Sequence, residues 1–468
     1  MPPRLSALDA SFLYLEAPTT PMHVGAVAVF ERGESGFSYD RLVELVEQRI
    51  STVPRYRQKV RRVPGNLARP VWIDDVAFDV AYHVRRSALP KPGSDAQLAE
   101  LVARLMSRPL DHARPLWEMY LVEGLDGDRV AVLTKTHQAM VDGMGAIDIG
   151  QVILDVSAQR RPATEELWMP RDEPTDSQLV LGALAESMAR PGVITDNVRS
   201  AAGDAAATVG KVAGVAGQLI SMALAASRKA PGTPLNVAIS TQRRFAIART
   251  CLEDYRRIRA VHGCTVNDVV LSVISGALRA WLMTRGAPVT TEATVRAMVP
   301  LSVRGEPDVP TSPGSLGNRV SAFLVDLPVG ESSPVVRLHH VTHAMREHTQ
   351  GGRSVTANAL VRIGGFAPPT LHALGARAAN GISKRIFNLV VTNVPGPQCP
   401  LYAAGARMQE VFPVVPLAKG QALAIGVNSY DGGVCYGFTG DRDAMADLDV
   451  LAGMVGESLE ELLGTVTA

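Results

Sequence analysis

A strand-like run that ends in a polar, glycine-containing cluster constrains the fold more than any other segment of this chain. Residues 128 to 136 are largely apolar or β-branched and partly alternate in polarity, which predicts a strand with one buried face. The run leads into Lys135-Thr136-His137-Gln138-Ala139-Met140-Val141-Asp142-Gly143. Residues 146 to 156 then place apolar side chains at roughly helical spacing, so we expect His137 to lie in a tight strand-to-helix connection.

The residue types in this connection suit proton transfer. An imidazole such as that of His137 can accept a proton from an alcohol or a thiol, because its unperturbed pKa of about 6.5 is near neutral pH. Gly143 allows a substrate to approach the backbone closely. The carboxylate of Asp142 can stabilise the connection through charge-assisted hydrogen bonds, and we expect an arginine as its partner.

Further short motifs follow one another in a fixed order. They are Leu8-Asp9 with Phe12, Pro21-Met22-His23-Val24-Gly25, Arg114-Pro115-Leu116-Trp117-Glu118, Thr265-Val266-Asn267-Asp268-Val269, Asn318-Arg319-Val320-Ser321 and Thr392-Asn393-Val394-Pro395-Gly396-Pro397. With residues 137 to 143 they make the chain resemble, over nearly its whole length, the bacterial wax ester synthase/diacylglycerol acyltransferase family, in particular its actinobacterial triacylglycerol synthase branch.

The resemblance implies an α/β fold of two chloramphenicol-acetyltransferase-like domains, each a mixed sheet covered by helices, with the active site in a tunnel between them. Residues 1–190 would form the N-terminal acyltransferase domain, 191–235 an Ala/Gly-rich, partly helical linker, and 236–468 the C-terminal acyltransferase-like domain. It also implies a diacylglycerol O-acyltransferase that transfers a long-chain acyl group from acyl-CoA to diacylglycerol. No metal or prosthetic cofactor is expected, and acyl-CoA is a substrate.

The same resemblance assigns site residues. The catalytic positions would be His137, Gln138, Asp142 and Gly143, and the substrate-binding positions Trp117, Asn267, Asp268, Asn318, Ser321, Asn393, Pro395 and Gly396. Three of these motifs also have a structural interpretation. Trp117 can anchor a core, Asn267 and Asp268 can cap a helix, and residues 393–397 form a rigid turn.

The chain departs from the family motif at one position. The family has two adjacent histidines, of which the second is the general base, and here the second position is Gln138. A glutamine amide cannot accept a proton near neutral pH. Three hypotheses follow: residual activity without a base at this position, a base role for His137, or the loss of catalysis.

Two alternative functions therefore accompany the acyltransferase prediction. One is a catalytically weakened homologue that binds lipid or acyl-CoA, which would bind without turnover. The other is a wax ester synthase that uses a fatty alcohol as the acceptor.

Charge and hydropathy limit the partners. With 47 Lys and Arg against 46 Asp and Glu, and no basic block, nucleic acid is not an expected partner. No segment has about 18 consecutive apolar residues, so a membrane-spanning helix is not expected. The hydrophobic fraction of 46% fits either a large core or contact with a lipid surface. We expect a cytoplasmic protein with reduced cysteines that lies peripherally at the inner membrane or at lipid droplets.

The second half shows an alternation typical of a sheet covered by helices. Strands are predicted at residues 243–250, 294–300, 320–325, 387–392, 422–428 and 433–437, and a helix at 266–282. Four histidines at 339, 340, 343 and 348 fall on another predicted helix. We interpret them as a solvated face, because no glutamate lies between the pair spaced four apart.

Overall fold

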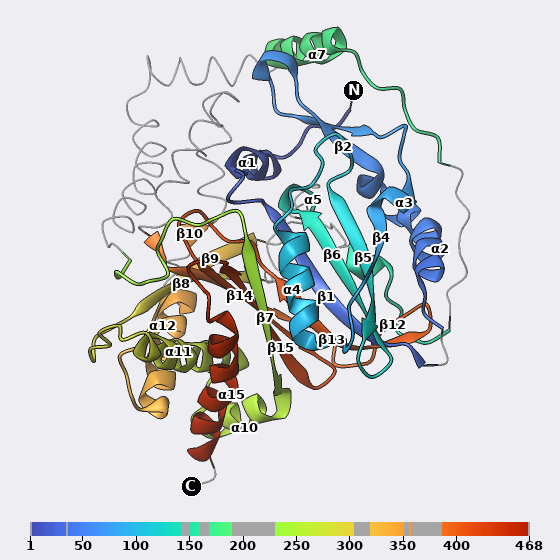
Figure 1. Ribbon diagram of the computed structural model, residues 1–468. Helices are drawn as coiled ribbons and strands as arrows, with labels where there is room; N and C mark the ends of the chain where they lie inside the picture. The colour runs from blue at the N-terminus through green and yellow to red at the C-terminus, as the bar shows by residue number, and fades with distance from the viewer. Residues whose placement is uncertain are drawn as a thin grey trace, which may run out of the picture.

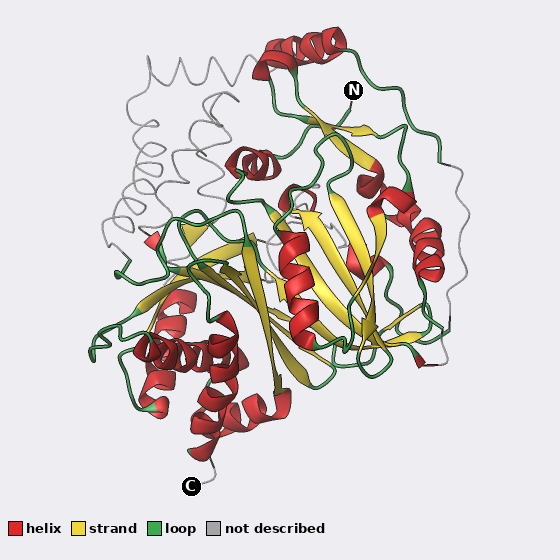
Figure 2. Ribbon diagram, in the orientation of Figure 1, coloured by secondary structure: helices red, strands yellow, loops and turns green. Residues whose placement is uncertain are grey.

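The chain folds into two mixed β-sheets with helices on their faces (Figures 1 and 2). The structure is a computed structural model that describes residues 2–33, 36–141, 149–159, 168–189, 230–303, 319–350, 355–356 and 386–466. The α/β class and the mixed, helix-covered sheets expected from the sequence are confirmed.

The first sheet has the strand order β12-β13-β1-β6-β5-β4, antiparallel except for the parallel pair of β4 and β5. Its strands are β1 (His23–Glu31), β4 (Val84–Ala88), β5 (Trp117–Leu125), β6 (Arg129–His137), β12 (Tyr402–Ala403) and β13 (Ala406–Val414). Two of these strands come from the C-terminal half. The first sheet therefore crosses the boundary that the sequence predicted between the halves.

The second sheet has the order β10-β9-β8-β11-β14-β15-β7, with parallel pairs where β11 meets β8 and β14. Its strands are β7 (Arg243–Cys251), β8 (Val295–Val303), β9 (Arg319–Leu327), β10 (Val355–Thr356), β11 (Leu389–Pro395), β14 (Leu423–Tyr430) and β15 (Gly433–Asp441). The six strands predicted in this half are therefore confirmed to within a few residues at their ends. A separate hairpin pairs β2 (Gln58–Arg61) with β3 (Val71–Asp74).

The helices cover the sheets from several sides. In the first half they are α1 (Ala7–Leu15), α2 (Tyr39–Arg49), α3 (Val80–His83), α4 (Asp95–Met106), α5 (Gln138–Val141), α6 (Ile149–Val152) and α7 (Asp176–Ala189). In the second half they are α10 (Leu252–His262), α11 (Val266–Thr284), α12 (Pro334–Gln350) and α15 (Leu448–Gly464). Figure 1 shows α11, α12 and α15 together on one side of the second sheet, where their buried side chains share one core with its strands.

Helix α4 lies where the two halves meet. Ser94 and Gln97 form a capping box that begins it, each side chain accepting a backbone N–H of the other residue. Its apolar side chains pack with residues of β1 and β6 and with Phe245 and Cys435 of the second sheet. Arg249 of β7 makes an ion pair with Asp95, with 2.8 Å between Nη2 and Oδ2. Helix α4 therefore joins the first sheet to the second.

Helix α11 is the one helix of the described ranges that is long and apolar enough to cross a membrane by composition. However, 72% of that apolar window is buried inside the protein. Its Trp281 is fully buried and donates its indole N–H to Asp447 at 3.0 Å. Helix α11 is therefore a core helix of the second half.

The helix expected over residues 146–156 is only partly present. The described part contains the short α6, after which the chain leaves the helical path, and Asp155 exchanges backbone hydrogen bonds with Tyr402 of β12. Arg49 fixes this bridge by donating to Asp155 Oδ2 at 2.6 Å. The backbone pairing of Asp155 with Tyr402 therefore ends the helix that the periodicity predicts. Of the linker predicted at 191–235, residues 191–229 lie outside the described residues.

Candidate active site

The predicted motif lies where β6 passes directly into α5. His137 is the last residue of β6, and its backbone N–H donates to Leu116 O at 2.9 Å. Gln138 is the first residue of α5, and its backbone N–H donates to Met22 O at 2.8 Å. His137 therefore lies where a strand passes into a helix, as expected, but this helix is α5 and not the one expected over residues 146–156, and no loop residue separates β6 from α5.

The ring of His137 is fixed and buried. Its side chain has 0% exposure, and Nδ1 accepts the backbone N–H of Ala139 at 3.0 Å. Because a backbone N–H can only donate, Nδ1 is unprotonated and the ring hydrogen lies on Nε2. Nε2 lies 3.6 Å from Oε2 of Glu16, which is close enough for electrostatic attraction but too long for a hydrogen bond. His137 thus has no free lone pair toward a substrate.

Glu16 holds a second imidazole beside the first. Its Oε2 accepts a hydrogen bond from His112 Nε2 at 2.7 Å, and its Oε1 accepts the backbone N–H of Met22 at 3.2 Å. The rings of His112 and His137 meet edge to face, with 6.0 Å between their centroids. One carboxylate oxygen therefore faces two imidazoles.

The electrostatics of this group favour an ionised Glu16. Burial alone would raise the pKa of this carboxyl, but the hydrogen bond from His112 and the nearby His137 outweigh burial and hold the pKa well below its usual range. An ionised carboxylate can only accept hydrogen bonds. His112 must therefore donate from Nε2, and in its neutral ring Nδ1 is the nitrogen with the lone pair.

Two more ionisable side chains lie beside the C-terminal end of α4. His23 pairs with His137 across β1 and β6, and its Nε2 lies 2.7 Å from Met106 O. Burial and the neighbouring Lys135 lower the pKa of His23 to about 3, so that its ring is neutral. The ammonium of Lys135 donates to Leu105 O at 3.1 Å. The negative end of the α4 dipole accounts for this gathering of donors.

Trp117 lies in the core of the first domain. It is fully buried, and its indole N–H donates to Tyr56 O at 2.8 Å. Its ring stacks on His83 at 4.5 Å. Trp117 belongs to the apolar cluster with α2, whereas alternate residues of the same strand, such as Tyr120, face α4. The structure therefore shows the packing role that was one interpretation of this tryptophan.

Asn267 and Asn393 are brought together although they are far apart in the sequence. Asn267 is in the first turn of α11, and its Oδ1 accepts a hydrogen bond from Asn393 Nδ2 of β11 at 3.0 Å. Asp268 is buried and accepts the backbone N–H of Thr265 at 2.8 Å, which completes a capping box in which Thr265 is the N-cap. The expected capping is thus carried out by Thr265 and Asp268, while Asn267 links α11 to β11.

The remaining predicted positions fall into two groups. Pro395 is the last residue of β11, where it pairs with Ser429 of β14, and Gly396 follows it. A Cβ at Gly396 would lie 2.5 Å from Ser429 O, so only glycine fits this approach. Ser321 is in β9, where its backbone pairs with Leu301. Asp142, Gly143 and Asn318 lie outside the described residues, and so does the contact expected between Asp142 and an arginine.

Sequence reasoning missed Glu16 and His112. They are 96 positions apart, so no local spacing joins them. The available signal was their position, since each lies within six residues of one of the recognised N-terminal motifs. A carboxylate and an imidazole next to such motifs are the residue types that proton transfer uses.

A metal centre is not indicated in the parts of the chain that the structure describes, where no three His, Cys, Asp or Glu side chains gather as ligands. His343 instead forms an exposed ion pair with Glu347 at 3.3 Å. The ring of His339 lies near that of His262, with 6.1 Å between centroids. His339 and His343 of α12 thus contact different partners and do not converge on one site.

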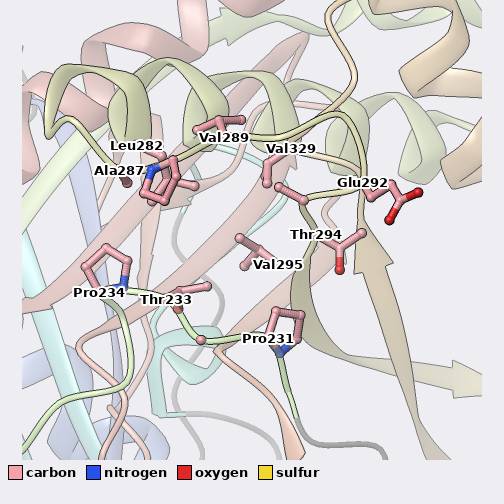
Figure 3. Close-up of a pocket in the computed structure, with 13 residues that line it drawn as sticks. Pro231, Thr233, Pro234, Leu282, Ala287, Val289, Glu292, Thr294, Val295 and Val329 are labelled. Atoms are coloured by element: carbon pink, nitrogen blue, oxygen red, sulfur yellow. The ribbon is translucent and has the colours of Figure 1, made fainter.

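A separate cavity of about 560 Å³ lies in the second domain. Figure 3 shows Pro231, Thr233 and Pro234 along one wall and Leu282, Ala287 and Val289 along the other. None of the predicted site residues lines it. The cavity is therefore distinct from the cluster of Glu16, His112 and His137.

Family models match both halves of the chain. Residues 5–270 match the wax ester synthase/diacylglycerol acyltransferase catalytic domain, and residues 316–463 match the WS/DGAT C-terminal domain. A probable diacylglycerol O-acyltransferase of Mycobacterium tuberculosis, tgs3, is 49% identical over 56% of this chain and 97% of its own length. A putative diacylglycerol O-acyltransferase of the same species is 32% identical over 98% of this chain and 90% of its own length.

Solved structures share the fold. The wax ester synthase/diacylglycerol acyltransferase of Marinobacter aquaeolei VT8 superposes with a TM-score of 0.69 at 27% identity, covering 99% of this chain and 100% of that one. The starter condensation domain of a rhizomide synthetase, in complex with C8-CoA and Leu-SNAC, has a TM-score of 0.57 at 15% identity, covering 100% and 95%. The expected two-domain fold of CoA-dependent acyltransferases is confirmed by these likenesses.

Proposed function

Because the chain belongs to the wax ester synthase/diacylglycerol acyltransferase family, we propose that it transfers a long-chain acyl group from acyl-CoA to diacylglycerol, giving triacylglycerol and free CoA. Acyltransferases of this family use acyl-CoA as their substrate. The relatives from Mycobacterium tuberculosis carry names that specify diacylglycerol as the acceptor. The proposal extends that acceptor to this chain.

One observation of the structure supports the proposal most strongly. The motif that carries the family's proton acceptor lies at a strand-to-helix junction, beside a largely buried carboxylate that faces two imidazoles. An acceptor hydroxyl must lose its proton as it attacks a thioester, and general bases of this kind contribute about 10² to 10⁴ in rate. The cluster therefore supplies the chemistry that the proposed reaction requires.

The test is the dependence of CoA release on the acceptor. Purified chain and a long-chain acyl-CoA would be assayed with diacylglycerol, with a fatty alcohol and with neither. We expect release of free CoA well above the background only with diacylglycerol. Release only with the fatty alcohol would make the chain a wax ester synthase.

Gln138 favours a second candidate function, a binding protein that has lost catalysis. Its side chain is half-buried at the first position of α5 and cannot accept a proton at neutral pH. Such a protein would bind acyl-CoA or lipid saturably and release no CoA with either acceptor. Equilibrium binding measured beside the acceptor assay separates this candidate from the enzyme.

Replacing His137 by asparagine is expected to leave kcat within about 10-fold of the native value, which is less than the loss of about 10² or more that accompanies removal of a general base. The oxygen of asparagine can accept the backbone N–H of Ala139, as Nδ1 of His137 does. Steady-state kinetics with diacylglycerol would measure kcat. If kcat fell 100-fold or more while the unfolding midpoint stayed unchanged, His137 would be the base.

We also propose that the protein is cytoplasmic and meets its lipid acceptor at the inner membrane or at lipid droplets, as a peripheral protein. Leu181 and Leu184 lie three positions apart on α7, with exposed fractions of 65% and 47%, so that they share one face. Exposed leucines on one helical face suit insertion at a lipid surface. Co-sedimentation with diacylglycerol-containing vesicles should be weaker for the double variant Leu181→Ser/Leu184→Ser than for the native chain. Equal co-sedimentation of the two proteins would mean that α7 makes no contact with the lipid surface.

A further inference from the structure

The pair of Glu16 and His112 has the geometry of an oriented general base. The Nε2–H of His112 donates to the ionised Glu16 at 2.7 Å, so that in the neutral ring Nδ1 carries the lone pair. The side chain of His112 is 39% exposed, whereas that of Glu16 is only 13% exposed. A largely buried carboxylate thus holds an imidazole whose side chain is partly exposed.

The neighbouring groups hold both residues in place. Glu16 is the C-cap residue of α1, and its second oxygen accepts the N–H of Met22. His112 lies in a turn after α4 in which Asp111 Oδ1 accepts the backbone N–H of Ala113 at 2.9 Å. Two separate segments therefore fix the distance between Glu16 and His112.

Other histidines around the motif are less suitable as bases. His137 is fully buried, and its Nδ1 is occupied by the N–H of Ala139. His23 is buried, with Nε2 bound to Met106 O, and His83 is buried with Nδ1 bound to Trp117 O. In the part of the chain that the structure describes, His112 is the partly exposed histidine of this group.

We propose that His112, positioned by Glu16, accepts the proton of the acceptor hydroxyl in place of the histidine that Gln138 replaces. This inference rests on the proposed acyltransferase function. The ring of His112 lies 6.0 Å from that of His137, the residue that directly precedes Gln138. A base in this position serves the same junction of β6 and α5.

The step is balanced without any further reactant. Nδ1 of His112 takes the hydroxyl proton while the hydroxyl oxygen forms a bond to the thioester carbonyl carbon. The carbon–sulfur bond then breaks, and its electron pair leaves with the sulfur of CoA. The imidazolium, stabilised by Glu16 as in other carboxylate–histidine pairs, returns the proton to that sulfur, which yields ester and free thiol.

Four variants test the base role of His112. In His112→Gln we expect kcat with diacylglycerol to fall about 10²- to 10⁴-fold, because a positioned base contributes this much. Adding Gln138→His should raise kcat at least 10-fold above that of His112→Gln. A merely structural defect would not allow this recovery. Gln138→His alone shows what the restored family motif contributes, and His340→Gln, an exposed histidine of α12, is the control for substitution.

Glu16→Ala tests the positioning role. We expect kcat to fall in the native background and to change less than about 2-fold in the His112→Gln background, because the two residues act as one unit. Losses that multiply in the double variant would overturn the positioning role of Glu16.

The outcomes separate the two proposals. A native chain that turns over while His112→Gln retains full kcat overturns the inference and leaves the proposed function standing. A loss in His112→Gln that Gln138→His fails to restore overturns the base role as well. A native chain that releases no CoA with diacylglycerol or a fatty alcohol overturns the proposed function, and the inference with it.

Discussion

Replacing Trp117 by alanine is expected to lower the free energy of unfolding by about 3 to 5 kcal/mol, the usual cost of removing a buried tryptophan from a core. Its side chain is fully buried, stacks on His83 and meets Tyr56 edge to face. The substitution also leaves Tyr56 O without the indole N–H. Denaturant titration followed by circular dichroism would measure the change.

Trp168→Ala is the matched control for this prediction, since it removes the same side chain from a partly exposed position. Trp168 contacts Phe78 edge to face and the guanidinium of Arg57. Trp168→Ala should lower the free energy of unfolding by at most about half as much as Trp117→Ala, because it removes less apolar area from the core. Equal losses in the two variants would contradict the packing role assigned to Trp117.

Replacing Gly437 by alanine is expected to cost at least about 1 to 3 kcal/mol, the range for overpacking a tight interior. Gly437 lies in β15 of the second sheet, and a Cβ there would come within 1.9 Å of the backbone oxygen of Pro413 in β13 of the first sheet. Its register partner Gly426 lies against the same proline, where a Cβ would be 2.6 Å from Pro413 Cβ. The two sheets therefore approach each other over a pair of glycines.

Gly453→Ala is the control for Gly437→Ala. Gly453 is an exposed position of α15 where an added Cβ meets no atom within 4 Å. Alanine is favoured over glycine in a helix by up to about 1 kcal/mol, so this variant should be equally stable or more stable. Thermal unfolding midpoints of both variants would measure the contrast. A Gly437→Ala protein as stable as Gly453→Ala would mean that the sheets can separate without cost.

Strands with a strong local pattern were predictable from the sequence. The β-branched run that forms β6, and the six predicted strands of the second half, show in the local composition of the sequence. The expectation that β6 has only one buried face is wrong, since residues on both of its faces are buried. The pairing of β13 with β1 was not predictable in this way. Which strand completes the first sheet depends on contacts between Gly25 and Val414 and between their neighbours, some 390 positions apart, which leave no local trace.

The site was predictable to a similar extent. Motif spacing identified His137 and Gln138 and the junction that holds them. It could not reveal that Nδ1 of His137 is occupied, because this depends on the ring orientation set by Ala139 N–H. It also could not reveal Glu16 beside His112, since that pair forms only when α1 and the turn after α4 meet.

The formation of labelled triacylglycerol tests the central claim most directly. Purified native chain would be incubated with a long-chain acyl-CoA labelled in its acyl group and with unlabelled diacylglycerol, and the lipid products would be separated and counted together with free CoA. The account predicts labelled triacylglycerol that accumulates over many turnovers in equal amount to the CoA released. Saturable binding of the acyl-CoA without any labelled ester would contradict it and would make this chain a lipid-binding relative of the acyltransferases.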